Sequence, residues 1–194
     1  MDRTRFSPLA TFALAPAVFA VVVGGCSGKD SYAPGSPIGT FHVSGKLTKS
    51  SCGSVPDPWE FDVKLRRDGP TLYWVQGGAP IQGRFSAGRA DLSAKEVHTL
   101  RPANAKQRLL ACAVVRADVL DVDLTNGGDN PVRELGETRA FRGTLVYRYT
   151  PTDDSDCADQ VSSSGGGFDS LPCEVRYDVN GALLPDAPAD EPKK

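Results

Sequence analysis

Four stretches of this chain alternate apolar and polar residues with a period of two, and this pattern limits the possible folds more than any other feature of the sequence. The alternating stretches are residues 41–47, 59–65, 141–149 and 173–179. Successive side chains of a β-strand point to opposite faces, so each stretch predicts a strand with one buried and one solvated face. The rest of the chain lacks the apolar spacing of an ordinary helix, and only residues 104–112 leave a short helix as an alternative.

Turn-forming residues between these stretches predict hairpins. Asp68-Gly69-Pro70 precedes a short apolar strand at residues 71–76, and Gly77-Gly78-Ala79-Pro80 separates that strand from another at residues 81–86. A longer apolar run covers residues 108–124 and ends in alternation. Connections this short make neighbouring strands antiparallel.

The fold class that follows is all-β: an antiparallel meander of seven or eight strands, closed as a small barrel or folded over as a bent sandwich. A sheet of this size has to bury one face, and a single chain does so by closing or folding the sheet. Gly45, Gly83 and Gly143 interrupt predicted strands and fit sharp curvature, because a side chain there would crowd the inner face.

The N-terminus has the composition of an export signal. Arg3 and Arg5 are followed by residues 6–25, which carry no charge and end in small residues. A basic head, an apolar middle and a small-residue exit are typical of a secretory signal peptide. Pro8 and Pro16 weigh against a transmembrane helix, because an interior proline removes a helical hydrogen bond and clashes with the preceding turn.

The segment Val23-Gly24-Gly25-Cys26 resembles the lipobox of bacterial lipoproteins, in which an aliphatic residue and two small residues precede a cysteine. The resemblance covers residues 1–26. It implies that the chain is cut before Cys26, whose thiol then carries diacylglycerol and whose new amino group takes a further acyl chain such as palmitate. Two or three acyl chains anchor a protein firmly in a membrane, whereas one does so marginally.

Sorting of such lipoproteins depends on the residue after the cysteine, where an aspartate favours the inner membrane. This chain has Ser27 in that place, so the resemblance implies the outer membrane rather than the inner one. We therefore expect a protein of the cell envelope whose domain lies in the periplasm or at the cell surface.

The predicted organisation has four parts: residues 1–25 are the signal peptide, 26–37 a lipidated flexible tether, 38–183 the β-domain and 184–194 a disordered, proline-rich tail. Of the 22 basic and 24 acidic residues, cleavage removes Arg3, Arg5 and Asp2. The mature chain then carries 20 basic and 23 acidic residues, a net charge of −3. We expect no nucleic-acid partner, because such binding normally needs a clustered basic surface. In its composition, the mature domain resembles the cysteine-paired, β-rich lipoproteins of Gram-negative bacteria. This resemblance identifies no functional residues.

Four cysteines remain for the mature fold: Cys52, Cys112, Cys157 and Cys173. An even number in an exported chain predicts two disulfides, because the periplasm is oxidising. Zinc is the alternative, but no two of these cysteines have the close spacing of zinc ligands. Of the three possible pairings we expect Cys157–Cys173, which would close a Ser- and Gly-rich loop at its base, and by elimination Cys52–Cys112. A free thiol at Cys112, inside the apolar run, remains the alternative.

Catalytic residues, metal ligands and a cofactor site do not stand out in the sequence. His42 falls on the polar face of its strand, and His98 has no nucleophile motif beside it. Two acidic segments, around residues 121–129 and 153–159, supply oxygens for calcium, but neither has EF-hand spacing. Solvated acidic turns are the preferred interpretation, and we expect neither an enzyme nor a cofactor.

Aromatic side chains offer the only candidates for ligand binding. Trp59, Trp74, Tyr147 and Tyr149 either line a cavity, as in lipocalin-like barrels, or fill the core, which is the preferred interpretation. The expected function is a membrane-anchored, non-catalytic binding or interaction module of the cell envelope, with another envelope protein as a partner. The alternative is a lipocalin-like carrier of a small apolar ligand, or a barrel-type inhibitor of a secreted enzyme.

Overall fold

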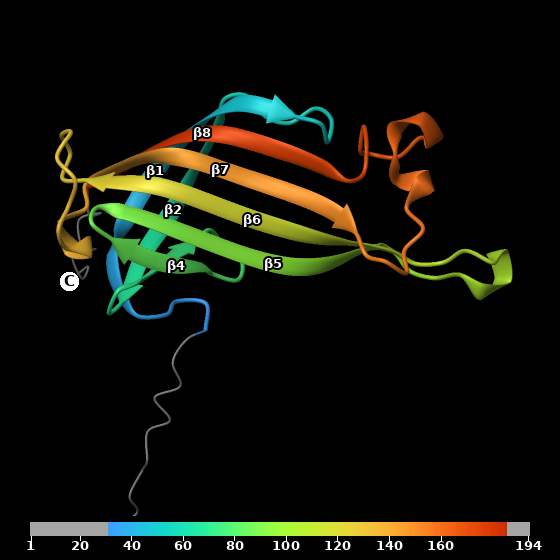
Figure 1. The fold of residues 1–194 in the computed structure, drawn as a ribbon, viewed down its shortest axis with the longest axis horizontal. Coiled ribbons are helices and arrows are strands. Elements are labelled where there is room, and N and C mark those ends of the chain that lie inside the picture. The colour runs from blue at the N-terminus through green and yellow to red at the C-terminus, as the bar shows by residue number, and fades with distance from the viewer. Residues whose placement is uncertain (1–30, 186–194) are drawn as a thin grey trace, which may run out of the picture.

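The computed structural model describes residues 31–185, and in this part of the chain eight antiparallel strands form a closed barrel (Figure 1). Each strand pairs with the next, and pairing of the first with the last closes the barrel. The strands are β1 (Ser36–Ser50), β2 (Trp59–Asp68), β3 (Thr71–Val75), β4 (Ile81–Ser86), β5 (Arg89–Arg101), β6 (Cys112–Thr125), β7 (Ala140–Pro151) and β8 (Cys173–Leu183). The predicted all-β meander is confirmed, as a barrel rather than a bent sandwich. The signal peptide, Cys26 and most of the predicted tail lie outside the described residues.

Helical structure in residues 31–185 is limited to single 3-10 turns, at Ala105–Gln107, Leu135–Glu137, Ala158–Gln160 and Ser162–Ser164. The first is all that forms of the short helix considered for residues 104–112. Its N-terminus is capped by Asn104, whose side-chain oxygen accepts hydrogen bonds from the Lys106 and Gln107 amides. Within the described part of the chain, no helix is long and apolar enough to span a bilayer.

The interior of the barrel is filled by the apolar half of each alternating strand. Phe41 and Val43 of β1 and Leu145 of β7 are each 0% exposed. Other inward side chains at 2% exposure or less include Leu65, Leu72, Trp74, Leu92, Leu120, Val122 and Leu124. The core therefore follows the period-two pattern that predicted the strands.

One end of the barrel, the turn end, is closed by compact connections. Two-residue turns at residues 69–70 and 87–88 join neighbouring strands. Ala87 and Gly88 both have positive φ, 50° and 84°, as a tight hairpin with right-handed strand twist requires. From the longer connection at residues 126–139, Val132 and Leu135 are 2% and 3% exposed and pack into the core. Apolar contacts thus seal this end.

The opposite end, the cystine end, contains both disulfides, and the predicted pairing is wrong. Cys52 bonds to Cys173, with an S–S distance of 2.09 Å, and Cys112 bonds to Cys157, with 2.01 Å. The error comes from the closure of the barrel, which places β1 beside β8. Ser50 of β1 pairs with Val175 of β8, so the cysteines just beyond this pair meet each other. All four cysteines are oxidised, which excludes a free thiol at Cys112.

Of the three glycines predicted to interrupt strands, two are required by close packing between strands. A Cβ on Gly83 would lie 1.9 Å from the Asp91 carbonyl oxygen, and one on Gly143 would lie 2.0 Å from that of Asp121. At Gly45 the nearest atom would be 3.4 Å away, an ordinary contact. The lack of a side chain at Gly83 and Gly143 therefore lets the neighbouring strand pack closely, as expected for glycines at sharply curved positions of a sheet.

The segment before β1 is bound to the barrel wall. β1 begins at Ser36, two residues before the predicted start of the domain. The Arg66 guanidinium donates hydrogen bonds to the carbonyl oxygens of Pro34 and Gly35, at 2.9 and 2.6 Å. Tyr32 lies beside the β3–β4 connection, where it lines a cavity with residues 76–78. The last residues of the predicted tether thus belong to the folded body.

Candidate functional site

A notch interrupts the barrel wall because β3 and β4 are shorter than their neighbours. β2 pairs with β3 only from Lys64 to Asp68, and β5 pairs with β4 only from Arg89 to Ser93. Within residues 31–185, no strand pairs with residues 59–63 on the edge of β2 that faces β3, or with residues 94–101 on the edge of β5 that faces β4. The notch is the opening between these two free edges, and the β3–β4 connection at residues 76–80 forms its floor.

Cavities lie on both sides of this floor. On the β2 side a cavity of 470 Å³ is lined by Tyr32, Phe61, Lys64 and residues 75–78, among others. On the β5 side a cavity of 250 Å³ is lined by Ala79, Ile81, Ala94, Lys95, Glu96, Arg116 and Asp118. An adjoining space of 160 Å³ extends to Trp74 and Tyr147. The notch therefore connects solvent with the aromatic interior.

Arg116 and Asp118 of β6 form a charged pair in this mainly apolar interior. The Arg116 Nε and Nη2 atoms donate hydrogen bonds to the two Asp118 carboxylate oxygens, at 2.7 and 2.9 Å. The guanidinium also stacks over the Tyr147 ring, 4.7 Å from its centre. Burial is the largest single influence on the Arg116 pKa and lowers it, but the hydrogen bond to Asp118 and the attraction of the Asp118 charge together outweigh burial and raise this pKa. Asp118 is only 9% exposed, whereas the Arg116 side chain is 36% exposed, so the carboxylate is withdrawn from water and the guanidinium is half-buried at the opening.

Two further polar groups lie in the aromatic wall behind the pair. Trp74 is 2% exposed, and its indole Nε1 has no hydrogen-bond partner in the described part of the chain. Burial raises the pKa of the Tyr147 hydroxyl well above its ordinary value, so this group stays protonated at physiological pH. Both residues line the 160 Å³ space with Arg116 and Asp118. This wall therefore contains hydrogen-bonding groups as well as aromatic surface.

The structure brings together three of the four aromatic residues predicted from the sequence. The Trp59 ring lies 5.9 Å from the Tyr147 ring and 4.4 Å from Phe61, which in turn lies 6.0 Å from Trp74. Tyr149 instead packs against Phe168 of the β7–β8 connection, with ring centres 5.7 Å apart. Trp59, Trp74 and Tyr147 thus fill the barrel at the notch, and Trp74 and Tyr147 line the 160 Å³ space.

The charged residues of the notch were missed by the sequence analysis, although a signal for them exists. Arg116 and Asp118 are in phase with Val114 and Leu120, whose side chains point inward. Extending the period-two register of β6 through these positions places both charges inside the barrel. Glu96 is found only through the structure, because nothing in its local sequence indicates that β4 ends before reaching it.

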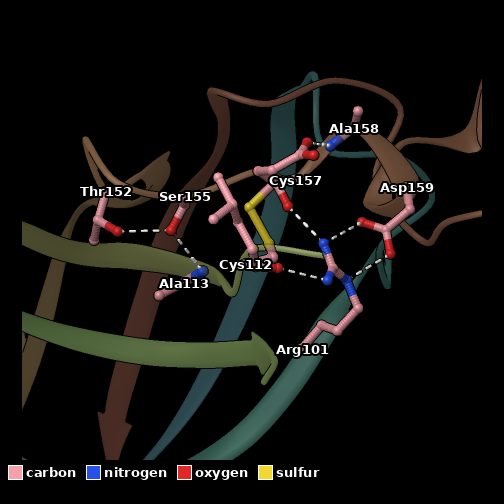
Figure 2. The surroundings of a disulfide bond; sticks show 10 residues. Arg101, Cys112, Ala113, Thr152, Ser155, Cys157, Ala158 and Asp159 are labelled. Atoms are coloured by element: carbon pink, nitrogen blue, oxygen red, sulfur yellow. Dashed lines mark hydrogen bonds and ion pairs between the residues drawn. A yellow bond between two sulfur atoms is a disulfide. The ribbon is translucent and has the colours of Figure 1, made fainter. Parts of the chain in front are cut away.

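Polar contacts around the second disulfide hold the base of the β5–β6 hairpin, which projects beyond the barrel (Figures 1 and 2). Arg101 at the end of β5 donates hydrogen bonds to the carbonyl oxygens of Leu110 and Asp156, at 2.6 and 2.8 Å. It also pairs with the Asp159 carboxylate, with a shortest N–O distance of 2.7 Å. The amide of Ala113 donates to the Ser155 hydroxyl, at 2.9 Å. These contacts join the hairpin to the β7–β8 connection and fix the direction in which β5 leaves the barrel.

The other polar residues considered in the sequence lie away from the notch interior or in ion pairs. His42 lies on the outer wall between Glu60 and Asp62, at 2.7 and 2.8 Å. In the acidic segments, Asp121 pairs with Arg89 and Asp159 with Arg101. Among residues 31–185, no three His, Cys, Asp or Glu side chains are arranged to hold a metal ion.

Comparison of the chain with protein-family models, with curated proteins and with solved structures gives no significant match.

Proposed function

We propose that this protein is a lipid-anchored, non-catalytic binding module of the cell envelope, and that it binds its ligand in the notch. The observation that carries the proposal is the Arg116–Asp118 pair, which lies where the barrel wall is open. The lipobox at residues 23–26 supports the anchor, and the disulfides support an oxidising compartment.

A ligand explains this pair better than stability does. Replacing a buried ion pair by apolar side chains of similar volume is often neutral or stabilising, because both charges lose their hydration on burial. The surrounding core of β6 consists of Val114, Leu120 and Val122, which require no charged neighbour. A guanidinium and a carboxylate at the wall opening instead supply fixed donors and acceptors to a ligand that enters there.

A carrier of a small apolar ligand is the second candidate, and the 470 Å³ cavity favours it. Phe61, Val63 and Val75 contribute apolar surface to its lining. The centre of the barrel is filled by Phe41, Trp74 and their neighbours, so such a ligand would bind at the side of the barrel rather than inside it.

The test of notch binding uses intrinsic fluorescence, because the two tryptophans of the chain, Trp59 and Trp74, both lie at the notch. The full-length protein in detergent is titrated with a detergent extract of the producing cell envelope. We expect the tryptophan emission to change, and the change to be lost in the Arg116→Met/Asp118→Leu variant. The matched control is Arg89→Met/Asp121→Leu, which removes an ion pair on the outer wall. An undiminished response in the first variant would refute notch binding.

The anchor is tested separately by membrane fractionation and mass spectrometry. The mature protein should begin at an acylated Cys26 and sediment with membranes, and Cys26→Ala should release or misprocess it. A chain that keeps Met1 and carries no lipid would contradict the anchor.

A further inference from the structure

We propose that the ligand of the notch is an extended peptide segment of another envelope protein, which binds as an additional β-strand along the free edge of β5. This inference rests on the proposed function, since it specifies the ligand of the same site. Three observations support it: the length and composition of the edge, the balance of charge in the notch, and the apolar surface that continues beside it.

The free edge of β5 is long enough for strand addition. Beyond Ser93, residues 94–101 pair with β6 on one side only. A register shift between Thr99 and Arg101 leaves residues 94–99 as the regular part, which spans about 20 Å at the rise of a β-strand. This is the length of a typical strand in a sheet.

The composition of this edge also permits pairing. Exposed edges are usually protected by charged side chains, by proline, by a bulge or by a covering loop, and residues 94–99 contain two charges, Lys95 and Glu96, but neither a proline nor a register shift. Lys95 is a charge that opposes indiscriminate association, which restricts pairing to a partner that matches it. Added strands of this kind obtain affinity from backbone hydrogen bonds and selectivity from alternate side chains.

The charges that line the β5 side of the notch suit the uncharged but polar backbone of a peptide. The 250 Å³ cavity is lined by two cations, Lys95 and Arg116, and two anions, Glu96 and Asp118. A ligand with a large net charge would leave one of these sets without compensation. Peptide groups offer both a donor and an acceptor, so they match a surface that carries both cationic donors and carboxylate acceptors.

The outer face of the β5–β6 hairpin adds apolar surface beside the edge. Val97 and Leu100 of β5 are 61% and 37% exposed. A β-branched or aromatic side chain opposite Val97 would form the cross-strand pair that stabilises sheets. We therefore expect a segment with apolar residues at alternate positions.

The probe is a capped synthetic peptide that copies residues 113–120, because this sequence already pairs with residues 92–99 of β5 on its other side. It contains no tryptophan, so the emission of Trp59 and Trp74 reports its binding to the full-length protein in detergent. We expect saturable binding. Methylation of alternate backbone nitrogens should weaken binding at least tenfold when the methylated nitrogens face β5, because the added strand then loses its hydrogen bonds. The alternative methylation pattern is the control.

Two variants locate the site on the protein. Val97→Lys should weaken binding of the probe at least tenfold, because it places a second positive charge beside Lys95 on the edge and removes the exposed apolar side chain. Leu110→Lys changes an equally exposed leucine at the end of the hairpin, outside residues 94–99, and should leave binding unchanged.

The possible outcomes separate this inference from the proposed function. If the envelope extract changes the tryptophan emission of the unaltered protein and not that of Arg116→Met/Asp118→Leu, while the peptide does not bind, the notch is a binding site and the strand inference is wrong. Equal binding of both methylated probes would also overturn it. If analytical ultracentrifugation of the protein without probe shows a dimer, and Val97→Lys makes it a monomer, the β5 edge binds a second copy of the chain instead. Binding of oleate but not of the peptide would favour the apolar carrier.

Discussion

The two ends of the barrel are held together by different physical means. At the turn end, two-residue turns and the buried side chains of Val132 and Leu135 suffice. At the cystine end the connections at residues 102–111 and 152–172 project beyond the core, and two disulfides with the hydrogen bonds of Arg101 fix them. The closed wall allows apolar sealing, whereas the notch removes part of the wall that would otherwise support the longer connections.

Where the barrel wall is open, disulfides and hydrogen bonds provide the stability that apolar contacts provide at the closed end. A notch needs free strand edges, and free edges supply few buried contacts. Both disulfides lie at the end of the barrel where β5 and β2 have free edges, rather than at the end that already has a sealed core.

Loss of the Cys52–Cys173 disulfide should have the largest effect on stability. The two cysteines are 121 residues apart, and the chain-entropy relation gives a contribution of about 5 kcal/mol for a loop of this size. Cys52→Ser/Cys173→Ser should therefore lower the free energy of unfolding by an amount comparable with the total stability of many domains. Urea unfolding followed by far-UV circular dichroism measures the loss, and retention of full stability would show that barrel closure does not depend on this bond.

Loss of the Cys112–Cys157 disulfide should have a somewhat smaller effect. Its cysteines are 45 residues apart, which corresponds to about 4 kcal/mol on the same relation. Cys112→Ser/Cys157→Ser is compared with the first variant in the same urea titration. If this variant proved the less stable of the two, local anchoring of the hairpin would outweigh loop entropy, and the ranking would be wrong.

At the turn end, Leu135→Ala should lower the free energy of unfolding by about 3 kcal/mol, because it leaves a cavity in a packed core. Leu135 is 3% exposed. The matched control, Leu110→Ala, truncates a leucine that is 61% exposed at the cystine end and should change stability by less than about 0.5 kcal/mol. Equal effects of the two substitutions would mean that apolar contacts do not distinguish the ends.

The outer wall between the two ends should contribute least. Hydrogen bonds from His42 to Asp62 and Glu60 raise the His42 pKa above 6.5. Stability from this contact is then fully present below pH 6.5 and is lost as the pH rises through the raised His42 pKa. The Glu60 pKa is lowered, by hydrogen bonds from Ser44 and His42, so its contribution is lost as the pH falls through that lowered value.

A proton NMR titration of the His42 ring measures this shift. In Glu60→Gln/Asp62→Asn the His42 pKa should return to about 6.5. The accompanying change in the urea midpoint between pH 5.5 and pH 8 should be smaller than that caused by loss of either disulfide or by Leu135→Ala, since the His42, Glu60 and Asp62 side chains are exposed. A larger change would place a determinant of stability in the wall.

Local patterns predicted the strands because each pattern depends on one strand at a time. Phe41 and Val43 identify their strand whatever its neighbours are, and Gly83 and Gly143 indicate close approach without naming the partner strand. The disulfide pairing failed because Cys52 meets Cys173 only through closure of the sheet, which no local pattern encodes. The notch was not predicted for a similar reason. The free edge at Glu96 depends on where β4 ends, which is a property of another strand.

Docking of the segment before β1 shortens the free tether and so limits the height of the barrel above a bilayer. Arg66 fixes Pro34 and Gly35, and Tyr32 lies at the floor of the notch. With the proposed lipid on Cys26, Tyr32 follows the anchor by only six positions, a reach of at most about 22 Å. A tether free up to residue 37 would reach nearly twice as far. The opening would therefore operate close to the headgroup layer, and its partners would be segments that emerge from the same membrane or lie on its surface.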